Sequence, residues 1–178
     1  MKPQIIVIDG PDNSGKSTLI NTLLQDQKYK LINFPKSVNG KCISLGTAND
    51  KALVETLYPL LDPNFIYILD RGYPSNVVYS GYLRGEMDPE VELADWKRFK
   101  EEFDIIEVIL TRNHLDIDFQ DDLIKLSRHQ FNLTITAYEQ CFENVFKLLE
   151  HDGKNKVISF NDNEFHRLLN YISNKTTA

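Results

Sequence analysis

The sequence predicts an α/β fold in which about five parallel strands form a sheet flanked by helices. Short apolar runs rich in β-branched residues alternate along the 178 residues with amphipathic helical patterns. These runs resemble strands that are buried on both faces, which is typical of a parallel sheet. Because no repeat, low-complexity stretch or linker interrupts the alternation, we expect a single three-layer domain over residues 1–178.

The first strand, at residues 4–9, leads into the most informative segment of the chain. Residues 10–17 (GPDNSGKS) match G-x-x-x-x-G-K-[ST], the phosphate-binding P-loop, and a helical pattern follows at 18–25. In this arrangement backbone N–H groups and the helix N-terminus surround a polyphosphate. Lys16 would reach the β- and γ-phosphates, and Ser17 would bind Mg²⁺. The alternative, an ordinary turn before a helix, explains the flanking strand and helix less well.

The rest of the chain continues the alternation of strands and helices. Polar residues with two glycines predict a loop at 36–46, after Pro35 has ended the second strand. Apolar positions on one face predict a single long helix over 121–150, which Gly153 ends. We expect further strands at 29–34, 65–69, 105–110 and 157–160, and further helices at 49–61, 75–84, 89–103 and 164–173.

Charge and composition exclude some classes of protein. The formal net charge of −6 argues against a general nucleic-acid-binding protein, which usually has a basic face, but a nucleotide enzyme needs only a local basic pocket. Cys42 and Cys141 have neither metal-ligand nor disulfide spacing, so we expect free thiols in a reducing compartment. There is no signal-peptide layout and no apolar run of membrane length, so we expect a cytoplasmic protein without a membrane partner.

Candidate site residues lie at the ends of three of the predicted strands, at the edge where open α/β sheets bind ligands. Asp12 follows the first strand, Phe34 ends the second, and Asp70 and Arg71 end the third. The carboxylate of Asp70 can position Mg²⁺ and the guanidinium of Arg71 can hold phosphate oxygens, although a surface ion pair is the alternative. Because like charges repel, Asp12 should point away from phosphate toward a hydroxyl of a second substrate, unless it only forms the turn.

Four stretches of the sequence resemble the thymidylate kinase-type nucleoside monophosphate kinases. The first is the P-loop at 9–18 with an acidic residue inside it, and the second is Phe-Pro-Lys at 34–36. The third, DRGYPSNVVYSG at 70–81, is similar to the family's DR-[YH]-x-x-S-x-x-A-[YF] without a gap. The fourth is Trp96, where the family often has an aromatic residue. The P-loop occurs in many folds, so the combination of Asp12 with the stretch at 70–81 is the specific part of a likeness that spans roughly 5–149.

The resemblance implies a deoxynucleoside monophosphate kinase that transfers the γ-phosphoryl of ATP to dTMP or a related pyrimidine deoxynucleotide, with Mg²⁺ as cofactor. It also implies a homodimer through the helices near 75–81 and 121–150, although their apolar residues could all belong to the core. ATP binding is assigned to Gly10, Asn13, Ser14, Gly15, Lys16, Ser17 and Thr18, and Mg²⁺ binding to Ser17 and Asp70. Acceptor binding is assigned to Asp12, Phe34, Lys36, Arg71, Ser75, Asn76 and Tyr79, and catalysis to Lys16, Arg71, Asp70 and Arg112.

The resemblance also implies individual roles at the acceptor site. Asp12 would accept the 3′-hydroxyl, Arg71 would bridge the donor and acceptor phosphates, and Lys36 would lie near the acceptor phosphate. Asn76 would hydrogen-bond a pyrimidine edge and Tyr79 would pack under the deoxyribose. The alternatives are helix capping for Ser75 and Asn76, core packing for Tyr79 and a solvated loop position for Lys36.

The sequence departs from the family pattern in its cations. The family has an arginine either after the P-loop acid, where this chain has Asn13, or in the lid after the fourth strand. The corresponding lid at about 112–122, whose closure should exclude water, has only Arg112 at its root and Lys125 or Arg128 beyond it. Residues 49–51 also match the family's base-reading helix poorly. Two alternatives therefore stay open: a P-loop kinase acting on a nucleoside, modified base or polynucleotide end, and a catalytically weak nucleotide-binding regulator.

Overall fold

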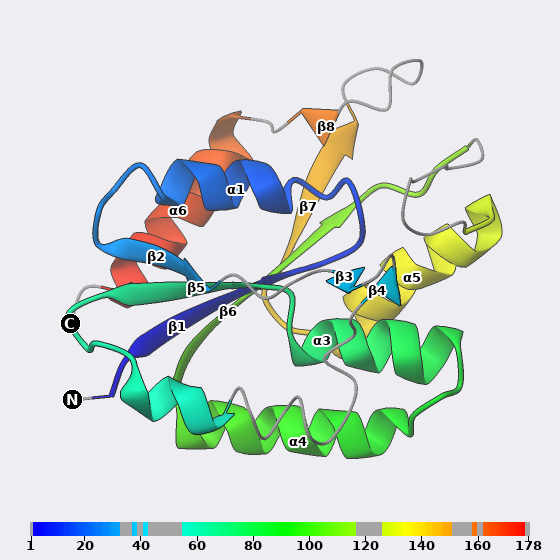
Figure 1. Ribbon diagram of the computed structural model, residues 1–178. Helices are drawn as coiled ribbons and strands as arrows, with labels where there is room; N and C mark the ends of the chain where they lie inside the picture. Colours follow the sequence, from blue (N-terminus) through cyan, green and yellow to red (C-terminus); the bar gives the residue numbers. More distant parts are fainter. Residues whose placement is uncertain are drawn as a thin grey trace.

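The computed structural model describes residues 2–32, 37–38, 41–42, 55–116, 126–150, 158–159 and 162–176. Within these ranges the chain forms a six-stranded sheet with helices on both faces (Figure 1). In order across the sheet, the strands are β2 (Tyr29–Ile32), β5 (Ile66–Asp70), β1 (Gln4–Asp9), β6 (Asp104–Arg112), β7 (Val145–Glu150) and β8 (Ile158–Ser159). The strands from β2 to β7 pair in parallel, which confirms the predicted fold class.

The two faces of β1 supply the two halves of the core. Ile5 and Val7 point to one face and Ile6 and Ile8 to the other, and all four are fully buried because helices cover both faces. On the first face lie the short helix α3 (Tyr73–Ser75), the π-helix η2 (Asn76–Leu83), α4 (Pro89–Glu102) and α5 (Arg128–Cys141). On the second face lie α1 (Lys16–Leu23) and α6 (Asp162–Thr176).

The predicted helix over 121–150 is wrong at its C-terminal end, and its N-terminal part at 121–125 lies outside the described residues, with α5 beginning at Arg128. Helix α5 ends at Cys141, and the chain turns at Asn144, which has a left-handed φ of 58°. The six residues that follow form β7, in which Phe146 and Leu148 are buried and Lys147 between them is exposed. This alternation is the period of a strand, but Phe142, Phe146 and Leu149 are also spaced as apolar residues are on one face of a helix.

Strand β8 lies within the predicted strand at 157–160 but runs in the opposite direction from the one expected. It pairs antiparallel to β7, with Glu150 opposite Ile158. A parallel connection needs a crossover of a dozen or more residues, and the chain has too few between these two strands. The fifth parallel strand is therefore β7, and β8 forms an antiparallel edge.

The predicted helix over 75–84 begins earlier and is of an unusual type. It starts with α3 and continues as η2, whose wide turn is visible in the hydrogen bond from Arg84 N to Tyr79 O at 3.2 Å. Such π-turns are rare and often occur at functional sites. Val77 and Val78, which could have formed a dimer contact, are fully buried within the protomer.

The predicted loop at 36–46 contains two short antiparallel strands, β3 (Ser37–Val38) and β4 (Lys41–Cys42). The sequence between them is Asn-Gly, the pair most typical of a two-residue hairpin, so the sequence does carry a signal for this hairpin. Phe34 and Lys36 lie outside the described residues. Part of the predicted helix at 49–61 also lies outside them, and its described end is helical at 55–57 and continues as the 3₁₀-helix η1 (Tyr58–Leu60).

The remaining predicted elements are confirmed with shifts at their ends. Helix α1 begins two residues before the predicted one, and β6 extends beyond the predicted strand at both ends. Helices α4 and α6 match the predictions at 89–103 and 164–173. None of the helices in the described ranges combines the length and apolar character that a membrane span requires.

Candidate active site

The P-loop connects β1 to α1 through three residues with left-handed backbone angles. The φ angles are 139° at Gly10, 55° at Asn13 and 86° at Gly15, which is the N-cap of α1. Gly10 also passes so close to β6 that a Cβ there would lie 2.2 Å from the Leu110 carbonyl oxygen. Glycine is the residue that tolerates both the angle and the approach, so the local backbone requires the glycines of the motif.

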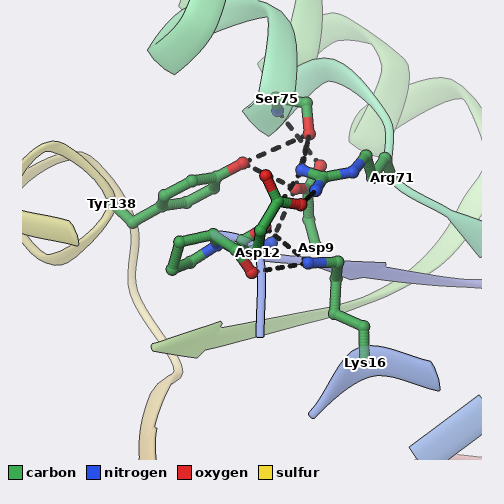
Figure 2. Close-up of polar contacts among 8 residues, drawn as sticks. Asp9, Asp12, Lys16, Arg71, Ser75 and Tyr138 are labelled. Atoms are coloured by element: carbon green, nitrogen blue, oxygen red, sulfur yellow. Dashed lines mark hydrogen bonds and ion pairs between the residues drawn. The ribbon is translucent and has the colours of Figure 1, made fainter. Parts of the chain in front are cut away.

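Lys16 is buried and folded back onto the P-loop. Its Nζ donates to the carbonyl oxygens of Gly10 at 2.8 Å and Pro11 at 2.6 Å (Figure 2). Burial, and then the nearby guanidinium of Arg71, lower the pKa of Lys16 to about 7, while neighbouring carboxylates partly offset the shift. The ammonium group lies at the loop carbonyls and can exchange them for the oxygens of a phosphate.

Arg71 lies across the P-loop from Lys16. Its Nη1 donates to the same Gly10 carbonyl at 3.1 Å and to Ser75 Oγ at 3.3 Å, and its Nη2 forms an ion pair with Asp12. The structure therefore brings predicted site residues together: the Gly10 carbonyl accepts hydrogen bonds from both Lys16 and Arg71, and Arg71 in turn contacts Ser75 and Asp12. The carboxylate of Asp12 points to Arg71, so its charge is compensated within the site.

A fourth residue of this group, Asp9, was missed in the sequence analysis. It is the last residue of β1, it is fully buried, and its carboxylate accepts five hydrogen bonds. Oδ1 accepts from Gly10 N at 2.7 Å, Ser75 Oγ at 2.7 Å and Tyr138 OH at 2.8 Å. Oδ2 accepts from Gly72 N at 2.9 Å and Ser75 N at 3.0 Å. A carboxylate at the end of an otherwise apolar buried strand needs such partners, and that was the available signal.

Asp9 also caps the helix that carries the acceptor residues. Gly72 is the N-cap of α3 and has no side chain to bond the first helical N–H groups. Asp9, at the end of β1, supplies the missing cap: its Oδ2 accepts hydrogen bonds from both Gly72 N and Ser75 N. The Ser75 hydroxyl donates to Asp9 and accepts from Arg71, so its role is to connect these two side chains.

Asn76 and Tyr79, both in η2, are buried next to this group. The guanidinium of Arg71 lies 5.5 Å from the centroid of the Tyr79 ring, whose edge-to-face partner is Tyr138 at 6.4 Å. Burial raises the pKa of Tyr79. The ring thus belongs to the core and also borders the site, so the two interpretations of Tyr79 are compatible.

Two oxygen-bearing residues could hold the predicted Mg²⁺. Ser17 is exposed on the first turn of α1, and Asp70 ends β5, opposite Ile8 in the sheet register. A hydroxyl and a carboxylate, completed by phosphate oxygens and water, suit Mg²⁺, which usually takes few protein ligands. Among the described residues no three His, Cys, Asp or Glu side chains form a metal cluster. The two residues therefore fit an ion that arrives with its phosphate ligand.

Arg112 is placed differently from Lys16 and Arg71. It is the last residue of β6, its exposed fraction is 1%, and its guanidinium lies 5.8 Å from the centroid of Phe131 in α5. Burial lowers the pKa of Arg112. Arg128, the other cation near the predicted lid, is exposed and donates to the Asp116 carbonyl at 2.5 Å. These positions favour Lys16 and Arg71 as the charges that face a phosphate.

Comparisons of the sequence and of the structure both find thymidylate kinases among the similar proteins. No protein-family model matches the sequence. A thymidylate kinase from Bacillus mycoides is 30% identical over 110 residues, which cover 48% of this chain and 53% of the relative. The chain spans about half the length of the curated relatives it matches, which include further Bacillus thymidylate kinases.

Solved structures match over nearly the whole chain. The thymidylate kinase from Candida albicans has a TM-score of 0.61 at 20% identity and covers 97% of this chain and 92% of its own. The YorR protein from Bacillus subtilis, described in complex with phosphorylated GDP, has a TM-score of 0.55 at 18% identity and covers 96% of both chains. The chain is therefore thymidylate kinase-like: it has the P-loop kinase fold of these enzymes and resembles their sequence over about half of its length.

Proposed function

We propose that the protein is a nucleoside monophosphate kinase that transfers the γ-phosphoryl of ATP to dTMP or a related pyrimidine deoxynucleotide. The observation that carries this proposal is the position of Arg71, which hydrogen-bonds the P-loop at Gly10 and forms an ion pair with Asp12. One guanidinium thus reaches both the donor side of the site and the residue expected to face the acceptor sugar. The thymidylate kinases among the similar proteins support the choice of acceptor.

Catalysis in this proposal consists of positioning and charge compensation. Lys16 exchanges its hydrogen bonds to the Gly10 and Pro11 carbonyls for phosphate oxygens of ATP. Arg71 donates hydrogen bonds to oxygens of both the transferring and the accepting phosphates. Its planar guanidinium suits this because it can bind two oxygen atoms at once. Ser17 and Asp70 would hold Mg²⁺, and the ion, when bound, neutralises charge on the phosphate oxygens. No general base is required because the acceptor phosphate is already an anion.

A purine nucleotide acceptor is the second candidate. It is favoured by the fold neighbour YorR, which is described in complex with phosphorylated GDP. The residues assigned to the acceptor base are Ser75, which ends α3, and Asn76, which begins the π-helix η2. The N-cap of α3 is Gly72, where the family has tyrosine or histidine. This difference in the acceptor stretch makes base specificity the part of the proposal that the assay must decide.

A coupled ADP-release assay with ATP and Mg²⁺ tests the proposal. The acceptors are dTMP, dUMP, dCMP, dGMP, dAMP, GMP, free nucleosides and single-stranded DNA. We expect turnover with a pyrimidine deoxymonophosphate, its loss in Lys16→Ala, and its retention in Lys28→Ala, a surface lysine outside the site. Turnover only with a purine nucleotide would show that the acceptor is a purine and not a pyrimidine. Turnover only with nucleosides or DNA would contradict the proposal of a monophosphate kinase.

Binding of ATP should take up a proton above pH 7. In the free protein the pKa of Lys16 is about 7 because the ammonium is buried and faces Arg71, so at pH 8.5 Lys16 is mostly neutral. The ATP phosphates favour the charged form and raise this pKa, so affinity should fall with rising pH by up to about tenfold per unit. Calorimetric titration at pH 8.5 in two buffers of different ionisation enthalpy measures the uptake. The Lys16→Met variant should show none, and buffer-independent heats in the wild type would contradict the mechanism.

A further inference from the structure

The carboxylate of Asp9 joins four parts of the candidate site. It accepts hydrogen bonds from the P-loop at Gly10, the turn at Gly72, helix α3 at Ser75 and helix α5 at Tyr138. An ionised carboxylate has about four lone-pair positions, and here five donors share them. Asp9 therefore has no capacity left to bind a metal ion or take a proton from substrate, and its contribution to the site has to be positional.

The acceptor-only character of this carboxylate fixes the direction of the neighbouring hydrogen bonds. The hydroxyl groups of Ser75 and Tyr138 must both donate to Asp9 Oδ1, at 2.7 and 2.8 Å. Burial, together with the nearby Asp9 charge, raises the pKa of Tyr138 well above its usual value, so the phenol keeps the proton it donates. Because the Ser75 proton points to Asp9, Ser75 Oγ presents only lone pairs to Arg71 Nη1.

The backbone of Arg71 is tied to β1 in the same way. Arg71 has a left-handed φ of 70°, a conformation that a non-glycine residue rarely adopts unless its surroundings hold it there. Its own N–H donates to the Ile8 carbonyl at 2.9 Å, and the following amide of Gly72 donates to Asp9 Oδ2 at 2.9 Å. Both the turn that carries Arg71 and the guanidinium itself are therefore held by the end of β1.

We propose that Asp9 and Tyr138 are positioning residues that hold Arg71 over the P-loop, acting through the Ser75 hydroxyl. The inference rests on the proposed function, in which Arg71 bridges the two phosphates. Its consequence is that the orientation of a cation at the end of β5 depends on α5, a helix from the other end of the chain. Figure 2 shows Tyr138 approaching the group from the side opposite to Lys16, with its hydroxyl toward Asp9 and Ser75.

The Tyr138→Phe variant tests the inference, since it removes the hydroxyl and keeps the ring. The matched control is Tyr58→Phe: Tyr58 is equally buried in the same core, and its hydroxyl has no hydrogen-bond partner in the part of the chain that the structure describes. We expect turnover to fall about tenfold in Tyr138→Phe with little change in the KM for ATP, and to change less than about twofold in the control. Asp9→Asn should lose more, about a hundredfold, and Tyr138→Phe decides the question if Asp9→Asn does not fold.

Combination with Arg71→Ala separates positioning from a general structural role. If Tyr138 acts through Arg71, then Tyr138→Phe should have almost no further effect on turnover in the Arg71→Ala background. If the two losses multiply, the inference is wrong.

A measurement that needs no turnover keeps this inference distinct from the proposed function. The rate at which phenylglyoxal modifies Arg71 is followed by mass spectrometry, with the exposed Arg167 as internal reference. We expect Arg71 to react several times faster in Tyr138→Phe than in the wild type, while Arg167 is unchanged. An unchanged rate at Arg71 would overturn the positioning claim even if turnover falls. Absence of turnover with every acceptor, together with faster modification, would reject the proposed function and retain the positioning.

Discussion

Replacing Arg71 with alanine should lower the rate of phosphoryl transfer about a thousandfold, the largest effect that we expect on turnover from one side chain. The guanidinium compensates charge that develops on the transferring phosphoryl, and cations in this role contribute about 10³-fold or more. The loss has a second cause in this protein: without Arg71, the negative charge of Asp12 would lie near the bound phosphates without its ion-pair partner. Single-turnover kinetics at saturating ATP measures the chemical step directly.

Two further variants separate the causes of this loss. Arg71→Lys keeps the positive charge but cannot hold two acceptors in a planar fork, so its turnover should lie between the wild type and Arg71→Ala. The double variant Asp12→Asn with Arg71→Ala removes the uncompensated carboxylate and should bind ATP more tightly than Arg71→Ala alone. A rate of transfer in Arg71→Ala within tenfold of the wild type would show that Arg71 does not face the reacting phosphates.

Substitution of Gly10 by alanine should have the largest effect on stability. The new Cβ would lie 2.2 Å from the carbonyl oxygen of Leu110 in β6, and the φ of 139° is one that residues with a side chain rarely adopt. Neither the β6 backbone nor the P-loop can move away without breaking the sheet pairing between β1 and β6. We expect a loss of about 4 kcal/mol or more in the free energy of unfolding, and no detectable ATP binding.

Gly85→Ala is the matched control for this prediction. Gly85 also has a left-handed φ, of 63°, but a Cβ there would meet nothing within 4 Å. The control should therefore cost only the backbone preference, about 1 kcal/mol, and leave ATP binding unchanged. Urea-induced unfolding followed by circular dichroism compares the two variants. Equal losses would mean that the contact with Leu110 contributes nothing and that the backbone angle alone explains the cost.

Local patterns were sufficient to predict most of the sheet. The strand at residues 4–9, the P-loop and the helix after it lie in one continuous segment, so their sequence signals reinforce one another. The boundary between α5 and β7 could not be found in this way, since apolar residues continue through Phe142, Phe146 and Leu149 at a spacing that fits a helix. Two features end the helix: the turn at Asn144 and the edge of β6, with which the following residues pair as β7. The pairing with β6 is a property of the tertiary structure and leaves no local sequence signal.

Some contacts of the candidate site could likewise be predicted from local motifs, and others could not. The approach of Lys16 and Arg71 to one loop carbonyl agrees with the prediction that both lie at the ligand-binding edge of the sheet. The contact between Asp9 and Tyr138 joins residues 129 positions apart, and no local signal marks a tyrosine in a helix as the partner of a distant carboxylate. The π-type turn of η2 was equally hidden, because apolar spacing does not distinguish it from an ordinary helix.

The central place of β1 in the sheet has a consequence for how the chain folds. Gln4 pairs with Ile66 on one side and with Asp104 on the other, so both neighbours of β1 are made long after it. Pairings this distant in sequence lose loop-closure entropy before any contact repays it, which slows folding. During synthesis β1 would lack its first neighbour until β5 is made at Ile66–Asp70 and its second until β6 is made from Asp104 on, and its apolar side chains would meanwhile be open to aggregation or to a chaperone. The segment that marks this protein most clearly in its sequence is thus one of the last to acquire its shape.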